Sequence, residues 1–583
     1  MKLPDHYPGG IWGVDFEFHP RAGREGNPPV PVCMVAKNFK TGESIRLWQN
    51  ELESLTEAPF PTDESALMVA YYASAEIGCF GVLDWPMPVN VLDLYISFRM
   101  HTNGRELPSG SGLLGAQIYF GLQPIGEDEK DSMRRLVLDG GPWNAGEQNA
   151  ILRYCESDVL ALENLLEALH PHIDWPRALL HGRYPSAVAR IELTGVPIDT
   201  PTFQLLLEQR EAVQLQLIQR IDSEFGVFEG TTFKADRFEG YLKKNGLEWP
   251  SSEAGRLDLS ESTFKDMCRV YPQIELLRQA RKALATLRKS ALQIGDDGRN
   301  RCLLSMYRSG TGRNQPSNSK SIFGQPSWMR GLIQPPPGFA LAYVDWSQQE
   351  FGIAAALSGD SAMLKAYQSG DPYLAFAKQA GAVPACATKH SHGKEREQFK
   401  ACVLAVQYGM AAESLAYRIG QPVARARQLL DLHKVTYCRF WEWSEGVLNQ
   451  ATLNRKLWTA YGWPLHVDNS PNGRSLRNFP MQANGSEMMR LACIRLTLDG
   501  IRVCAPVHDA ILVEAPLGEI EGVVHHTQDV MARASAAVLG GFALSSDAKV
   551  MRYPSRFLED RGRPMWNEVM DILGLHHLLY SPE

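Results

Sequence analysis

Two apolar stretches, far apart in the chain, each run into an aspartate. The first is Leu341-Ala342-Tyr343-Val344-Asp345; the second flanks Asp509, with Cys504–Val507 before it and Ile511–Val513 after it. Short apolar runs bounded by turn residues are typical of buried strands. We therefore expect Asp345 at the end of a strand and Asp509 at the tip of a tight hairpin. A fold that brings strand ends together could hold both carboxylates in one site.

A cationic stretch lies between the two aspartates. Arg396, Lys400, Leu404 and Tyr408 follow at four-residue spacing and Gly409 comes next, so they share one face of an expected helix. Cations on such a face can grip a triphosphate, and an aromatic ring at its end can stack on a base. A solvated helix face is the alternative, but the change from cationic to aromatic residues favours a nucleotide site.

The paired aspartates suit phosphoryl transfer, which needs positioning and charge neutralisation more than covalent help. Two Mg²⁺ ions about 3.5–4 Å apart supply this, and each needs only one or two protein carboxylates. The alternative is that both are ordinary turn aspartates. The cationic helix between them favours the metal site.

Length and composition set outer limits. With 583 residues, the chain is long enough for two to four domains, and it has no uninterrupted apolar stretch of membrane-spanning length. The N-terminus lacks the apolar region of a signal peptide, and ten scattered cysteines without a CxxC pair indicate reduced thiols. A net charge of −7 does not exclude a polyanionic partner, because local basic clusters decide such binding.

The residue patterns divide the chain into successive segments. About 170 residues of alternating strands and helices end at a break over 170–176, and a long helical stretch follows to about 292. Residues 295–337 are rich in Gly, Ser, Asn, Pro and Arg, which predicts loops. A mainly helical block then runs from the Asp345 strand to about 453, and mixed strand and helix completes the chain.

A second group of acids lies near the N-terminus. Asp15 and Glu17 share one face of the strand expected at 11–18, because alternate strand residues point the same way. Tyr154 and Asp158 are four residues apart on the helix expected at 147–170. Taken alone, such acids on a strand and a helix favour a solvated surface.

The chain resembles family A DNA polymerases, the group that includes bacterial DNA polymerase I. Residues 345–350 (Asp-Trp-Ser-Gln-Gln-Glu) resemble motif A, the Arg396–Gly409 pattern motif B, and 507–509 (Val-His-Asp) motif C. Thr311-Gly312-Arg313 resembles the TGR segment, and Arg474, Asn478 and Gln482 resemble the helix that touches the DNA minor groove. The matches cover about 190–560 in the expected order.

The resemblance implies a role for each matched residue. Asp345 and Asp509 would bind two Mg²⁺ ions, with Mn²⁺ as a substitute, and His508 would position the primer end. Glu350 would leave no room for a 2′-hydroxyl, which favours deoxynucleotides. The implied nucleotide-binding residues are Arg396, Lys400, Tyr408, Glu350, Gln349 and Leu404. The implied DNA-binding residues are Thr311, Arg313, Arg330, Arg474, Asn478 and Gln482.

Three positions depart from the family pattern. Ala510 stands where motif C continues with Glu, Gly352 replaces an Arg, and Leu404 replaces the aromatic of motif B. The two-metal chemistry needs none of the replaced residues, although Leu404 bears on how the 3′-hydroxyl is recognised.

The N-terminal acids resemble the DnaQ-like 3′–5′ exonuclease domain. By that resemblance Asp15, Glu17, Glu76 and Asp158 hold the metals, and Tyr154 orients the attacking water. Glu76 takes the place of a middle Asp, with Asp93 as the alternative. His390 and His392 lack flanking ligands, which favours a basic loop over a metal site.

The expected architecture is α/β and α+β: an RNase H-like exonuclease domain (1–175), then a right-hand polymerase (176–583). The thumb covers about 190–295, the palm about 296–354 and 466–583, and the fingers about 355–465. The expected protein is a cytoplasmic monomer from a bacterium or phage, without a 5′ nuclease domain, acting on primer–template DNA and dNTPs. Two alternatives are a single-subunit RNA polymerase and a DNA-binding protein that synthesises nothing.

Overall fold

The structure is a computed structural model, which describes residues 6–21, 24–123, 127–251, 255–289, 291–407, 409–468 and 472–578. Within these ranges, none of the helices combines the length and the apolar character needed to cross a membrane.

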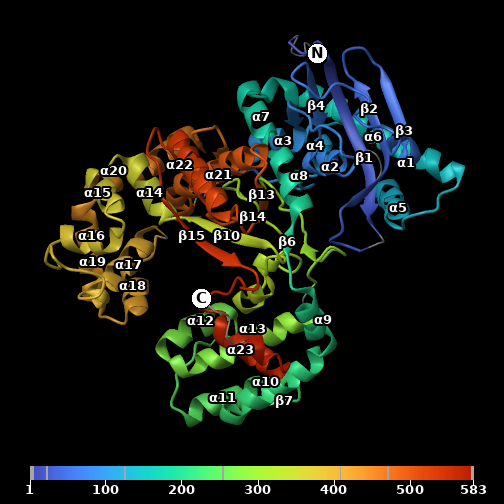
Figure 1. Cartoon of the computed structure of the whole chain (residues 1–583). Coiled ribbons are helices and arrows are strands. Elements are labelled where there is room, and N and C mark those ends of the chain that lie inside the picture. The colour runs from blue at the N-terminus through green and yellow to red at the C-terminus, as the bar shows by residue number, and fades with distance from the viewer. Residues whose placement is uncertain are drawn as a thin grey trace.

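A five-stranded sheet forms the centre of the N-terminal unit, residues 6–194 (Figure 1). Its strand order is β3-β2-β1-β4-β5, with β2 antiparallel to β1, and with β4 and β5 parallel to it. The strands are β1 (Gly10–Pro20), β2 (Pro29–Asn38), β3 (Ser44–Trp48), β4 (Ala66–Ala70) and β5 (Val91–Asp93). The strand expected at 11–18 is thus β1.

Helices cover both faces of this sheet. Alternate β1 residues Val14 and Phe16 pack against α2 on one face, and α6 packs on the other. Helix α6 begins at a capping box of Asn144 and Glu147 and corresponds to the helix expected at 147–170. The helices are α1 (Gln49–Leu52), α2 (Ser74–Val82), α3 (Leu94–Thr102), α4 (Leu113–Tyr119), α5 (Glu127–Leu138), α6 (Ala145–Leu169), α7 (Trp175–Gly182) and α8 (Tyr184–Thr194).

The N-terminal unit extends beyond the border expected at 175. Helix α7 packs against β5 and α8 packs against α2, because Ala178 of α7 and Ala189 of α8 are buried in two hydrophobic clusters of this unit. Helix α8 also contacts α21, so it joins the two halves of the molecule.

A four-stranded antiparallel sheet, called the central sheet, has the order β13-β14-β10-β15. Helices α21 and α22 pack together over it, and α14 lies beside α21 (Figure 1). These elements are β10 (Phe339–Trp346), β13 (Arg502–Val507), β14 (Ala510–Pro516), β15 (Ser546–Arg552), α14 (Gln349–Ser358), α21 (Gly473–Leu498) and α22 (Ile520–Val538).

Two helical lobes flank the central sheet (Figure 1). The side lobe contains α15 (Ser361–Gln368), α16 (Pro372–Gln379), α17 (Gly393–Gln407), α18 (Ala412–Ile419), α19 (Val423–Thr436) and α20 (Cys438–Asn454), followed by the hairpin β11 (Lys456–Trp458) and β12 (Pro464–His466). The lower lobe contains α9 (Thr200–Glu208), α10 (Arg210–Phe225), α11 (Ala235–Lys244), α12 (Glu261–Val270) and α13 (Glu275–Lys289), with the short pair β7 (Phe228–Glu229) and β8 (Thr232–Phe233). The pair β6 (Val196–Pro197) and β9 (Arg299–Asn300) connects the lower lobe to the rest.

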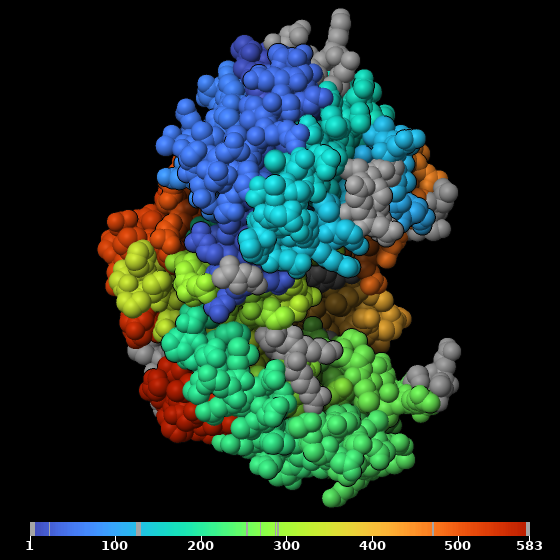
Figure 2. All heavy atoms as spheres, turned by 90° about the vertical axis from the view of Figure 1, so that its right-hand side faces the viewer, coloured from blue at the N-terminus to red at the C-terminus, as the bar shows by residue number. Residues whose placement is uncertain are grey.

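The last helix, α23 (Arg563–Ile572), lies within residues 466–583, which were predicted to belong to the palm. It packs against α10 and α13 of the lower lobe, because Trp566, Val569 and Met570 are buried in that core. Figure 2 shows the molecule hollowed between the N-terminal unit and the lower lobe, with the side lobe set back behind the hollow.

Candidate functional site

Asp345 and Asp509 lie at the same edge of the central sheet. Asp345 is near the end of β10 and is the register partner of Ala510, the residue after Asp509. The backbone N–H of Trp346 donates to the carbonyl oxygen of Asp509 at 3.1 Å. The sheet therefore brings together the two carboxylates that the sequence placed at separate strand ends.

The electrostatics of this edge favour a cation. Burial, together with the charges of Asp509 and Asp547, raises the pKa of Asp345 to about 7. Burial also raises the pKa of Asp509. Oδ1 of Asp345 is buried and has no hydrogen-bond partner in the described structure. A buried, unsatisfied carboxylate oxygen beside further acids fits a divalent ion.

Asp547 is a third acid at this edge, and the sequence reasoning missed it. It lies on β15 as the cross-strand partner of Asp345, opposite to Ala510. The Ser347 hydroxyl donates to its Oδ2 at 2.6 Å. No local motif marks Asp547, because only the pairing of β10 with β15 places it here.

Two strained backbone positions adjoin the acids. Gln348 has φ +44° and His508 has φ +57°, both in the left-handed region that L-residues rarely adopt. Such conformations concentrate where a fold must aim functional groups. Burial lowers the pKa of His508, so its imidazole is neutral at pH 7.

A cavity of about 350 Å³ adjoins these residues. Its lining includes Arg313, Glu350, Tyr373, Leu404, His508 and Asp509. Burial raises the pKa of Glu350, while the Arg313 guanidinium, 3.8 Å away, opposes that rise. Gln349 also lines the cavity, although only 3% of it is exposed. The predicted sugar-facing residue, Glu350, therefore lies beside Asp509.

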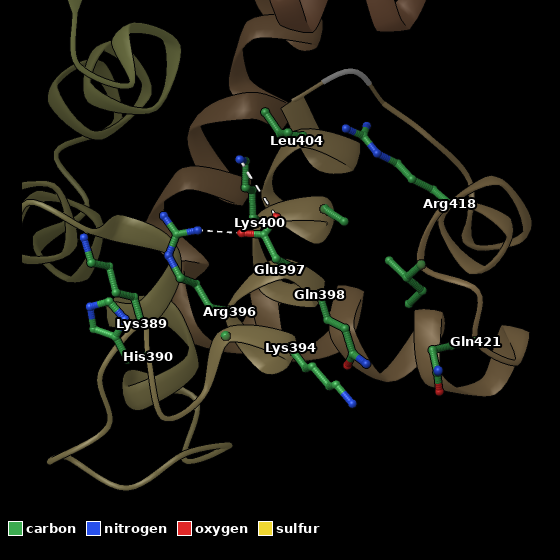
Figure 3. Close-up of a pocket in the computed structure, with 13 residues that line it drawn as sticks. Lys389, His390, Lys394, Arg396, Glu397, Gln398, Lys400, Leu404, Arg418 and Gln421 are labelled. Atoms are coloured by element: carbon green, nitrogen blue, oxygen red, sulfur yellow. Dashed lines mark hydrogen bonds and ion pairs between the residues drawn. The ribbon is translucent and has the colours of Figure 1, made fainter. Parts of the chain in front are cut away.

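The cationic helix is α17, and a larger cavity of about 1080 Å³ lies along it (Figure 3). Arg396 and Lys400 line this cavity together with Leu404, which also lines the smaller one. Arg418, from α18, extends towards the cavity from the far side (Figure 3). Sequence reasoning missed Arg418, because only the packing of α18 against α17 brings it close.

Arg396 is held by acids in this structure. Its Nε donates to Asp371 at 2.6 Å, its Nη1 donates to Glu397 at 2.6 Å, and its guanidinium lies 5.5 Å from the Tyr373 ring. Any anion that bound this guanidinium would have to replace these partners. Lys400 is nearer to solvent and lies 3.9 Å from Glu397.

Two other predictions concern this lobe. Tyr408 lies outside the described residues. His390 lines the larger cavity, and no metal-ligand cluster is found around His390 and His392 within the described ranges.

The predicted DNA-contact residues separate into two groups. Arg474, Asn478 and Gln482 follow one face of α21, where Arg474 is exposed and the other two are half-buried. Thr311 and Arg313 lie in a loop shaped by Ser309, whose hydroxyl accepts from the Arg313 N–H at 2.8 Å. These residues could all face a ligand.

Arg330, another predicted DNA-binding residue, is buried. Only 8% of it is exposed, because its guanidinium forms an ion pair with Glu559 and donates to the Phe323 carbonyl at 3.2 Å. These contacts join the C-terminal segment at Glu559 to the segment that contains Phe323 and Arg330.

Asp15, Glu17 and Asp158 form the second acidic cluster. Each offers a carboxylate oxygen within 4.8 Å of the others, and no other such group of three is found among the described residues. Oδ2 of Asp15 is buried without a partner. Burial and mutual repulsion raise the pKa of Asp15 and of Glu17. The donor set and the unsatisfied oxygen fit a divalent cation.

The other predicted residues of this cluster surround it. Glu76, in the first turn of α2, accepts from the Phe16 N–H at 2.7 Å, and burial followed by the Asp15 charge raises its pKa. The pKa of Tyr154 is also raised by burial and then by Asp158. Asp93 instead caps α3, accepting from the N–H groups of Tyr95 and Ile96.

A lysine enters this cluster from α5. Lys130 Nζ lies 2.8 Å from Asp158 Oδ1, with both side chains largely buried. Sequence reasoning missed Lys130, because nothing in the local pattern of α5 points to the acids.

Comparison with known proteins identifies part of the chain. Residues 267–550 match the family model described as DNA polymerase family A. These residues form a family A DNA polymerase domain. The domain contains Asp345, Asp509 and both cavities, whereas the Asp15 cluster lies outside the match.

The polymerase domain has relatives in bacteria and phages. "DNA polymerase I, thermostable" of Thermus thermophilus is 24% identical over 82% of this chain and 62% of its own length. The chain thus spans less than two thirds of that relative. "DNA polymerase" of Mycobacterium phage D29 is 25% identical over 79% of each chain.

The fold also matches a solved polymerase structure. The POL domain of Pol1 from M. smegmatis, in complex with DNA primer-template and dNTP, superposes with a TM-score of 0.70. The match covers 94% of this chain and 96% of the other at 17% identity. At that identity the likeness concerns the fold.

Proposed function

We propose that the chain is a template-directed DNA polymerase that extends a DNA primer with dNTPs. The observation that carries this proposal is the convergence of Asp345 and Asp509 beside a cavity that also contains Glu350. In this assignment the central sheet is the palm, the side lobe the fingers and the lower lobe the thumb.

The nucleotide would lie across the two cavities that share Leu404. Arg396, Lys400 and Arg418 would bind the triphosphate, and Glu350 would lie against the sugar. Asp345 and Asp509 would hold two Mg²⁺ ions, which lower the pKa of the primer 3′-hydroxyl and neutralise the charge of the leaving pyrophosphate. Arg313 would hold Glu350 in place, since they are already within 3.8 Å.

Arg396 has to change partners during the cycle. Its bonds to Asp371 and Glu397 would give way to phosphate oxygens, which form stronger, charge-assisted bonds with a guanidinium. Because Asp371 and Arg396 lie on different segments of the fingers, this exchange links nucleotide binding to a movement of α17.

Primer extension tests the polymerase proposal. A labelled primer–template is incubated with Mg²⁺ and the four dNTPs, using wild type, Asp345→Asn and Asp509→Asn. We expect both variants to lose extension by at least about a thousandfold, since each removes a metal carboxylate, and to bind DNA as wild type does. Extension by Asp509→Asn at the wild-type rate would refute the assignment. Ribonucleotides in a parallel reaction test the RNA polymerase alternative.

We also propose a 3′–5′ exonuclease activity for the N-terminal unit. The cluster of Asp15, Glu17 and Asp158 supports it, with Glu76 as a further acid and Tyr154 placed to orient water. The same labelled DNA, incubated without dNTPs, measures this activity. Asp15→Ala is expected to stop shortening of the primer and to leave extension intact; loss of both activities would contradict separate sites.

A further inference from the structure

A third cavity, with a polar lining, lies between the N-terminal unit and the β11–β12 hairpin. Its volume is about 550 Å³, in the range of sites that bind small ligands. Residues from α3, α7 and both hairpin strands line it, and the polar ones include His101, Arg105, Arg177, Lys456, Trp458 and His466. Neither of the two proposed active sites contains these residues.

The walls of this cavity are fixed to each other. Asn103, which follows α3, donates through Nδ2 to the Pro464 carbonyl at 2.6 Å, and its own carbonyl accepts from the His466 N–H at 2.9 Å. Gly104 has φ +89°, and a Cβ there would meet the His466 carbonyl oxygen at 2.2 Å. The hairpin is therefore seated on the N-terminal unit by specific bonds and by a close backbone approach.

The cavity has an excess of positive charge. Arg105, Arg177 and Lys456 line it, whereas Asp174 is the single carboxylate among its lining residues and is paired with Arg177. Burial, together with neighbouring basic groups that include Arg105 and Lys456, lowers the pKa of His101 and of His466 to about 4. Both imidazoles are neutral at pH 7 and can hydrogen-bond, so the cavity favours an anion.

An aromatic ring is exposed beside these cations. Trp458 on β11 is 50% exposed, although tryptophan usually packs inside. Cations that follow a phosphate backbone, with an aromatic ring on which a base can stack, are the features that bind single-stranded nucleic acid. A free phosphate would use the cations but not the ring.

The cavity also adjoins the loop predicted to contact DNA. The Gly310 carbonyl, directly before Thr311, accepts from Asn103 Nδ2 at 2.7 Å and from Trp463 Nε1 at 3.0 Å. The hairpin also precedes α21, which carries Arg474, Asn478 and Gln482. Asn103, which also bonds to the lining residue Pro464, therefore links this loop to the wall of the cavity.

We propose that this cavity binds the phosphates of a single DNA strand and that Trp458 stacks on one of its bases. The inference rests on the proposed polymerase function and adds a binding site for the unpaired strand beside the primer–template duplex. The strand is either the unpaired template ahead of the primer end or an unpaired primer 3′ end, which share the same chemistry.

Fluorescence anisotropy on the full chain tests the proposal, in EDTA so that no DNA is degraded. The probes are a blunt duplex, the same duplex with a 5′ template extension, and the duplex with an unpaired primer 3′ end. The variants are Arg105→Ala/Lys456→Ala and Trp458→Ala. The matched control is Arg495→Ala/Arg533→Ala, which removes two exposed cations from α21 and α22.

We expect both test variants to bind one extended duplex about tenfold more weakly, with binding of the blunt duplex and the control variant unchanged. For the double variant, the slope of log K against log salt should fall by about 1.4, because each single-strand phosphate contact contributes about 0.7. The extension that loses affinity identifies the strand.

Two results would overturn the proposal: wild-type binding of both extended duplexes by both variants, or equal weakening on the blunt duplex. Lys456→Arg keeps the charge and should bind as wild type, which separates loss of charge from loss of fold. Primer extension by the wild type on the same DNA tests the polymerase function separately. Failure of the polymerase proposal can therefore be distinguished from failure of the single-strand binding proposal.

Discussion

Asp547→Asn should weaken metal binding at the polymerase site without abolishing it. Asp547 is the cross-strand partner of Asp345, and such partners have Cβ atoms about 4.5–5.5 Å apart. A carboxylate about 5 Å from a divalent ion contributes about 1.7 kcal/mol at the dielectric constant of water. Salt screening reduces this value, because Asp547 is exposed, so we expect about a tenfold loss of affinity.

Two measurements check this expectation. Paramagnetic resonance titration of Mn²⁺ reads binding directly, and Mg²⁺ titration of primer extension should show an approximately tenfold higher half-saturating concentration with an unchanged maximal rate. Asp529→Asn is the matched control, since it removes an exposed carboxylate of α22 that pairs with Arg533. If Asp547→Asn binds Mn²⁺ as wild type does, Asp547 has no part in the metal site. If Asp547→Asn stops extension even at saturating Mg²⁺, the Asp547 carboxylate does more than attract the metal ion electrostatically.

Three other predictions concern separate parts of the chain. Glu192 is half-buried, its carboxylate accepts from the Leu304 N–H, and desolvation of that carboxylate raises its pKa from 4.5 to about 8. The folded state therefore holds a proton that the unfolded state releases, so this contribution to stability is full below pH 4.5 and is lost as pH rises through 8. Glu192→Gln keeps the acceptor and should remove this loss of about 4–5 kcal/mol, measured by urea unfolding at acid and alkaline pH. Glu350→Ala should raise ribonucleotide incorporation by about 10- to 100-fold in single-nucleotide extension, because it empties space beside the sugar. Lys130→Ala should lower the Mg²⁺ needed for exonuclease activity, because the ammonium competes with a cation for Asp158; an unchanged or higher requirement would contradict that competition.

Local patterns predicted the elements that carry the acids. The alternation around Asp15 and Glu17 corresponds to β1, and the four-residue spacing of Tyr154 and Asp158 places both on α6. The apolar runs around Asp345 and Asp509 correspond to β10 and the β13–β14 hairpin. These features could be found because strand and helix periodicity depend on neighbouring residues.

Pairing between distant elements could not be predicted in the same way. Asp547 lies beside Asp345 because of the β10–β15 register, Arg418 lines the larger cavity because α18 packs on α17, and Lys130 pairs with Asp158 because of the position of α5. Each lies in an ordinary local pattern. Arg330, named as a DNA-binding residue only through the family resemblance, is buried in an ion pair with Glu559, a distant partner that no local pattern reveals.

A raised pKa alone does not identify either active site. The pKa values of Glu192 and Asp345 are both raised, to about 8 and about 7. Burial alone raises the pKa of Glu192, whereas the charges of neighbouring acids add to the effect of burial on the pKa of Asp345. Repulsion between like charges opposes folding, so carboxylates that converge around an unsatisfied oxygen indicate a ligand that offsets this cost. The same reasoning applies to Asp15, whose unsatisfied oxygen faces two further acids. Glu192 has only the Leu304 N–H and no acid partner among the causes of its shift, so it belongs to the packing of the fold.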